Sequence, residues 1–156
     1  MLTLKINNAD QIIRTLTKIA EHTDGRKRAG LMRNIAGTMR MAVLDNFEAG
    51  GRPAWLGIKH RSGTPLNDTG NLKKSIQQTY DANTAKVGTN EPYAAIHQFG
   101  GVITPKKGKY LIFKIGDRWV MTDKVTIPAR PFLTLTEQDE ADILQDVQDY
   151  WQNVLK

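Results

Sequence analysis

A stripe of apolar side chains with helical spacing runs through residues 27–48, and no other feature of the chain constrains its fold as strongly. The stripe consists of Leu31, Met32, Ile35, Ala36, Met39, Ala42, Val43, Leu44 and Phe47. Because it is wide, it predicts a long helix that buries one face in a core. A shorter amphipathic helix is predicted over residues 10–21, with Asp10 as its N-cap. Gly25 is expected to end that helix in a left-handed conformation.

Strand signals dominate the second half of the chain. Residues 72–80 and 84–88 predict one hairpin, and residues 110–115 and 118–122 predict another around the Gly-Asp pair between them. Residues 124–127 add a short strand.

Helical and turn signals separate and follow these strands. Pro92 begins a helical turn over residues 92–98, and FGG at 99–101 turns the chain. PARPF at 128–132 is stiff and irregular, because each proline disfavours helix in the residue before it. A final helix is predicted over residues 137–155, capped by Thr136.

The order of these elements predicts an α+β fold, in which an antiparallel β-sheet packs with two N-terminal helices and a C-terminal helix. A length of 156 residues fits one domain that spans residues 1–156. No apolar run reaches the ~18 residues of a membrane span, and the first residues lack a signal-peptide pattern. We therefore expect a soluble protein with no membrane partner.

The least regular stretch is residues 49–70, which contains five glycines and two prolines. We expect residues 49–65 to form a flexible loop of functional importance, because long unstructured loops are uncommon in compact domains. Trp55, Leu56 and Ile58 either pack on the core or become ordered only against a partner. The candidate interaction residues are Arg52, Trp55, Leu56, Lys59, Arg61 and Arg130.

Charge is distributed unevenly along the chain, whose net charge is +6. Residues 1–78 carry 13 basic and 6 acidic side chains, whereas residues 79–156 carry 9 and 10. The basic half suits a nucleic acid or an acidic protein, or is simply a solvated surface. The last twenty residues are acidic, so one copy could also meet the basic face of another.

Catalytic signatures are absent from the sequence. The chain has no cysteine, and its three histidines, His22, His60 and His97, show no metal-ligand spacing. His97 is interpreted as a hydrogen-bonded structural residue. No phosphate-binding glycine loop or nucleophile elbow is present, so we expect no enzyme activity, cofactor or metal. A hydrolase with a site assembled from distant residues, such as Asp68, Asp117 and Asp123, is the remaining enzymatic alternative.

Three blocks of sequence resemble a known family. LNDTGNLKKSI at 66–76, GTNEPYAAIHQFGG at 88–101 and TIPARPFLTLTEQDEADI at 126–143 are similar, in order and spacing, to blocks of phage virion-morphogenesis proteins of the Mu G-like, tail-completion type. The blocks supply a structural motif that consists of Asp68, Gly70, Tyr93, His97, Phe99, Gly100, Pro131 and Phe132.

The motif residues have physical interpretations of their own. Asp68 can accept backbone hydrogen bonds and Gly70 can adopt a positive φ, so that a fixed turn leads into the first strand. Tyr93, Ile96 and Phe99 are expected to pack their turn against the sheet. Arg130 is held rigidly between Ala129 and Pro131, which favours a carboxylate partner inside the fold or on a neighbouring subunit.

The resemblance implies a non-enzymatic protein of the virion tail or neck, which is present in the host cytoplasm during assembly. Such a protein would complete the tail or neck for head–tail joining by contact with other tail or neck proteins. It would act as part of a homo-oligomeric ring, with non-specific contact with DNA in the tail passage. The alternative function is sequence-independent nucleic-acid binding, which the basic half of the chain supports.

Overall fold

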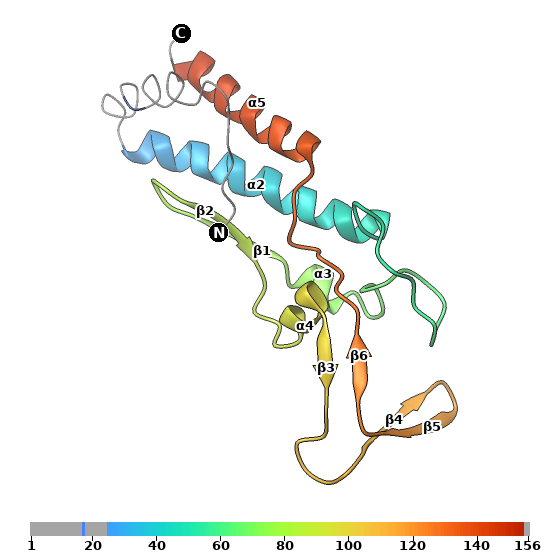
Figure 1. Cartoon of the computed structure of the whole chain (residues 1–156). Coiled ribbons are helices and arrows are strands. Elements are labelled where there is room, and N and C mark those ends of the chain that lie inside the picture. Colours follow the sequence, from blue (N-terminus) through green and yellow to red (C-terminus); the bar gives the residue numbers. More distant parts are fainter. Residues whose placement is uncertain (1–16, 18–24, 155–156) are drawn as a thin grey trace.

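Two long helices lie side by side and run in opposite directions (Figure 1). The computed structural model describes residue 17 and residues 25–154. Helix α2 spans Gly25–Ala49 and helix α5 spans Glu137–Val154, so the helices predicted over residues 27–48 and 137–155 are confirmed. The helix predicted over residues 10–21 lies outside the described residues apart from Thr17, and His22 lies outside them as well.

Gly25 is the first described residue of helix α2. The helix end that Gly25 is predicted to form lies outside the described residues, so that role stays a prediction.

The core lies where the C-terminal half of α2 meets the middle of the chain. Phe47 and Phe132 are its two largest fully buried apolar side chains, and their rings lie 5.4 Å apart. Their buried neighbours are Val43, Leu72, Ile76 and Ala94, and the half-buried side chains packed on this cluster are Leu44, Trp55, Leu66 and Val87. The apolar stripe predicted for α2 therefore supplies one wall of the core.

The β1–β2 hairpin covers the face of α2 that lies opposite α5 (Figure 1). Strands β1 (Gln77–Tyr80) and β2 (Ala85–Gly88) pair antiparallel, as predicted. The expected strand over residues 72–80 is too long, because its first residues form the short helix α3 (Asn71–Lys74). Gly70 precedes α3 with a φ of 74°, so its predicted positive φ is confirmed.

The chain then forms a long projection that we call the β arm, residues 101–127. Strand β3 (Gly101–Ile103) pairs with β6 (Val125–Ile127), and β4 (Leu111–Ile115) pairs with β5 (Arg118–Thr122). Figure 1 shows β3 and β6 leading away from the long helices, with the β4–β5 hairpin at the far end. The α+β class is confirmed, but within residues 25–154 the strands form three separate two-stranded ladders.

Helix α4 (Ala94–Phe99) and Gly100 set the direction in which the arm leaves the body. Gly100 has a φ of 71° and a ψ of 179°, a combination that is essentially restricted to glycine. A Cβ atom there would lie 2.7 Å from the backbone nitrogen of Ala129 and 2.9 Å from the carbonyl oxygen of Ile127. The predicted turn at residues 99–101 is therefore confirmed, and it brings β3 against the chain that leaves β6.

Candidate interaction surface

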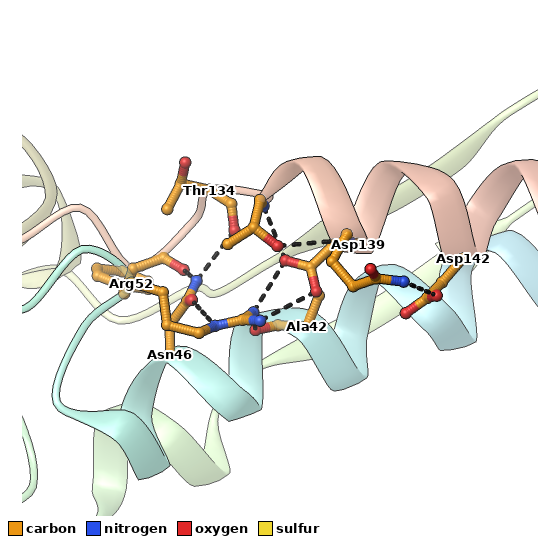
Figure 2. A network of polar contacts seen from close by, with 9 residues as sticks. Ala42, Asn46, Arg52, Thr134, Asp139 and Asp142 are labelled. Atoms are coloured by element: carbon orange, nitrogen blue, oxygen red, sulfur yellow. Dashed lines mark hydrogen bonds and ion pairs between the residues drawn. The ribbon is translucent and has the colours of Figure 1, made fainter.

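Arg52 fastens the start of the loop to both long helices (Figure 2). Its guanidinium donates to both carboxylate oxygens of Asp139 in α5, at 3.1 and 2.9 Å, and to the carbonyl oxygen of Ala42 in α2 at 2.6 Å. Its Nε donates to Oδ1 of Asn46 at 2.8 Å. Arg52 is thus a bidentate clamp inside the chain, and most of its hydrogen-bonding capacity is used there.

Asn46 extends this network to the segment after β6. It is fully buried, and its side-chain nitrogen donates to the carbonyl oxygens of Phe132 at 2.8 Å and Thr134 at 3.0 Å. Asn46 was not singled out from the sequence, although a signal was present: it lies three residues after Val43, inside the apolar stripe of α2. A polar residue at a stripe position requires buried partners.

Asp139 joins the network to the start of α5 and was also missed. Its backbone nitrogen donates to the Thr136 hydroxyl at 3.2 Å, and its carboxylate accepts from the Thr136 backbone nitrogen at 2.8 Å. The predicted Thr136 cap is confirmed, and Asp139 completes a reciprocal capping box. Burial alone raises the pKa of Asp139, but the hydrogen bonds from Thr136 and Arg52 outweigh it and hold the pKa below its ordinary value.

Arg130 fastens the middle of the loop. Its Nε donates to the Leu56 carbonyl oxygen at 2.8 Å and its Nη2 to the Gly57 carbonyl oxygen at 3.0 Å. Within the described residues these donors bind two backbone carbonyls instead of a carboxylate, and the alternative of a carboxylate on a neighbouring subunit stays a prediction. Arg130 is buried in the fold, where the loop needs partners for carbonyl groups turned inward.

Trp55 packs on the core, one of the two alternatives that the sequence left open. Its ring meets Phe47 edge-on, with centroids 5.8 Å apart. Its Nε1 donates to the carbonyl oxygen of Pro131 at 3.0 Å. The indole therefore joins the loop to the PARPF segment as well as to α2.

Residues of the second and third sequence blocks, at 88–101 and 126–143, are hydrogen-bonded to each other. The side-chain oxygen of Gln98 accepts hydrogen bonds from the backbone nitrogens of Phe132 at 3.0 Å and Leu133 at 2.9 Å. The backbone nitrogen of Arg130 donates to the His97 carbonyl oxygen at 2.7 Å. Gln98 was part of the HQF block but was not singled out. Its role depends on a segment more than thirty residues away in the sequence.

The residues around His97 partly contradict the predicted packing. Tyr93 meets the His97 ring edge-on at 6.0 Å, but Phe99 is 78% exposed and does not pack against a sheet. Gly100 changes the direction of the chain immediately after α4, so that Phe99 stays on the solvent-exposed side of the chain. Nδ1 of His97 is buried without a hydrogen-bond partner within residues 25–154, so the predicted hydrogen-bonded role is not supported. Burial lowers the pKa of His97, and the charge of Arg130 lowers it further.

Arg61 and Asp68 form the outer edge of the loop. Arg61 donates to the carbonyl oxygens of Ser62 and Thr64 and pairs with the exposed Asp68 carboxylate at 3.6 Å. Asp68 thus meets a side chain instead of the expected backbone groups. In the part of the chain that the structure describes, Asp68, Asp117 and Asp123 do not form a cluster that could hold a metal ion.

Leu56 and Lys59 are the predicted loop residues that face outward. Leu56 is 68% exposed and Lys59 is exposed, and both line a groove of about 920 Å³ between the loop and the β arm. The apolar walls of the groove come from Ile58, Phe113, Ile115, Val125, Ile127 and Pro128. The six candidate residues therefore have different roles. The loop is held by Arg52, Trp55 and Arg130, and its edge is stabilised by Arg61. Leu56 and Lys59 remain available for contact.

A fastened loop beside an apolar groove is a surface suited to contact with another protein. The chain matches the phage virion morphogenesis family over residues 7–152 and belongs to that family. It is 55% identical over 156 residues to the Mu-like prophage FluMu G protein 2 of Haemophilus influenzae, with 100% of each chain covered. No solved structure matches it. The resemblance seen in the three sequence blocks is confirmed, and the chain has a structural or assembly role in a phage particle.

Within residue 17 and residues 25–154, no helix is long and apolar enough to cross a membrane.

Proposed function

We propose that the protein completes the tail or neck of a tailed phage or prophage particle so that heads and tails can join. It acts by protein–protein contact, as a subunit of a ring, in the virion tail or neck, and is present in the host cytoplasm during assembly. It is not an enzyme, and its partners are other tail or neck proteins. The observation that carries this proposal is the full-length likeness to a Mu-like prophage G protein.

The loop and groove supply a contact surface for this role. Arg52 and Arg130 hold the loop by hydrogen bonds, so Leu56 and Lys59 are presented from a fixed backbone. A fixed surface loses less conformational entropy on binding than a loop that must first become ordered. Partners therefore bind a preformed edge in which an apolar side chain lies near a lysine.

Genetic complementation tests the proposal. A Mu-like prophage that carries this gene is induced after deletion of the gene, and electron microscopy counts free heads, free tails and complete particles. We expect heads and tails to accumulate unjoined and the wild-type gene, supplied in trans, to restore complete particles. Joined, infectious particles without the gene would refute the proposal.

A surface variant tests the loop. Leu56→Asp combined with Lys59→Glu should fail to restore particles although the protein folds normally, because both side chains are exposed. Thr79→Asp, on an exposed position of β1, is the matched control and should restore them. Equal restoration by both variants would remove the loop from the contact surface.

Contact with DNA in the tail passage is a second role, favoured by the first turns of α2. Lys27 and Arg33 are exposed there, and the first turn of this helix contains no acidic residue. We infer a sequence-independent contact with phosphates, whose affinity falls steeply with salt. Binding of duplex DNA that is unchanged in a Lys27→Glu/Arg33→Glu variant would exclude these residues.

A further inference from the structure

The far end of the β arm exposes an apolar face. Ile112 is 66% exposed, Trp119 is 73% exposed and Met121 is 65% exposed. In the β4–β5 register, Ile112 lies opposite Met121, and Lys114 lies opposite Trp119. Because side chains alternate along a strand, these residues share one face of the hairpin, while Phe113 and Ile115 face the groove.

An exposed apolar face on a short hairpin indicates that a partner covers it. A two-stranded hairpin is only marginally stable in water by itself. Clustered exposed apolar side chains, especially when charged residues surround them, are typical of protein interaction sites. The arm has this composition, because lysines lie on the loop that precedes the hairpin and within the hairpin.

The charges on the molecule suggest what covers the arm. Residues 101–127 carry six basic and two acidic side chains, a net charge of +4. The basic ones are Lys106, Lys107, Lys109, Lys114, Arg118 and Lys124, and the acidic ones are Asp117 and Asp123. Helix α5 carries six acidic side chains and no lysine or arginine, a net charge of −6. Asp139 is paired with Arg52 inside its own chain, and the exposed carboxylates of α5 are those of Glu137, Asp142 and Asp149. These exposed carboxylates are complementary in charge to the arm.

The outer face of α5 also offers apolar contact. Ala141 and Leu144 are exposed on one side of the helix, and the exposed carboxylates of Asp142 and Asp149, two turns apart, lie about a quarter turn around the helix from Ala141. Within one copy, the β4–β5 hairpin and the outer face of α5 lie at opposite ends of the molecule (Figure 1). The arm can therefore reach this face only on a second copy.

We propose that the β arm of one copy packs on the outer face of α5 of the next copy. Ile112, Trp119 and Met121 meet the exposed apolar side chains of that helix, and the arm lysines meet its carboxylates. The two surfaces are different, so the contact is heterologous, and heterologous contacts form a ring when the rotation between copies closes. The inference rests on the proposed ring and specifies which surfaces build it.

Disulfide trapping in the purified full-length protein tests this contact, because the natural chain has no cysteine. One variant carries Met121→Cys in the arm and a second carries Ala141→Cys in α5. Oxidation of the mixture should produce the mixed dimer, and a chain that carries both cysteines should produce a ladder that ends at one closed size. Asn83→Cys, exposed in the β1–β2 turn, replaces either cysteine as the control and should not cross-link.

Charge variants test the electrostatic part of the contact. Lys106→Glu/Lys107→Glu/Lys109→Glu should lower the yield of the mixed dimer about tenfold, equivalent to roughly 1.4 kcal/mol of contact free energy. Asp142→Lys/Asp149→Lys in the partner should restore it. Lys74→Glu/Lys86→Glu, two exposed lysines outside the arm, should leave the yield unchanged.

Several results would overturn the contact. These are a mixture that yields no mixed dimer, a dimer formed mainly between two arm cysteines, a control that cross-links equally, and a wild-type protein that stays monomeric at every concentration. Absence of the mixed dimer is also the result expected if the arm binds another virion protein instead of a second copy. If the cross-linking fails but particle formation still depends on the gene, the proposed contact is wrong and the proposed function stands. If particles form without the gene, the proposed function is wrong, whatever the cross-linking result.

Discussion

Replacing Arg52 with alanine is expected to lower the free energy of unfolding by about 3 kcal/mol. Arg52 donates four hydrogen bonds, two of them to Asp139. Without the guanidinium, the carboxylate of Asp139, only 7% exposed, loses its cation. Removing one partner of a buried ion pair costs about 3–5 kcal/mol. We expect the lower end, because the Arg52 side chain is 26% exposed and Thr136 still donates to the carboxylate.

Urea unfolding, followed by circular dichroism at one protein concentration and in one oligomeric state, measures this loss. Arg61→Ala is the matched control from the same loop. Its ion pair with Asp68 is exposed, and such pairs contribute about 0–1 kcal/mol. An Arg52→Ala loss within about 0.5 kcal/mol of the control would refute the argument that Arg52 clamps the loop to α5.

A double-mutant cycle separates the pair from the rest of the network. Asp139→Asn removes the charge of the carboxylate but keeps its shape, so the unpaired buried charge disappears. The double variant Arg52→Ala/Asp139→Asn should therefore be more stable than the sum of the two single losses predicts. Additive losses would mean that Arg52 acts through Ala42 and Asn46 instead.

Three further predictions concern the surroundings of the loop. Trp55→Ala should cost about 3 kcal/mol of unfolding free energy, whereas Leu56→Ala, at an exposed position, should change it by less than about 0.5 kcal/mol in the same urea assay. Gly100→Ala should cost about 2 kcal/mol more than Gly108→Ala, because both have positive φ but only the first Cβ would strike backbone atoms; equal thermal shifts would contradict this. Because the pKa of His97 is lowered in the folded state, the unfolded chain binds more protons below pH ~6.5, so stability falls as pH drops through that range. His97→Gln should flatten that slope, and an unchanged slope would exclude His97 as its source.

Local signals in the sequence predicted most of the helices and the hairpins. The α2 stripe, the Thr136 cap and the turn at Gly116 each depend on residues close together in the chain, so spacing alone reveals them. The β3–β6 ladder was not predicted as a pair. It joins Gly101 to Ile127 across the whole arm, and three-residue strands carry too little alternation to identify a distant partner.

The roles of the loop arginines were not accessible to local reasoning for a related reason. Arg52 lies in a glycine- and proline-rich stretch and looks solvent-exposed, because arginine is rarely buried unless it is paired. Its partner Asp139 is 87 residues away, and the acidic segment that contains Asp139 offers five other carboxylates with equal local claims. Only the side-by-side packing of α2 and α5 selects one of them.

The loop and the β arm have different roles, although the sequence predicted a contact surface at the loop and none at the β arm. The loop is held on the core by Arg52, Trp55 and Arg130, so these three side chains stabilise the subunit. The β arm lacks such fastening at its end, where Trp119 and Met121 are exposed beside basic residues. Charged side chains on short exposed strands oppose uncontrolled edge pairing. The arm lysines therefore serve the free subunit by limiting aggregation, and the same charges give the arm its preference for an acidic helix.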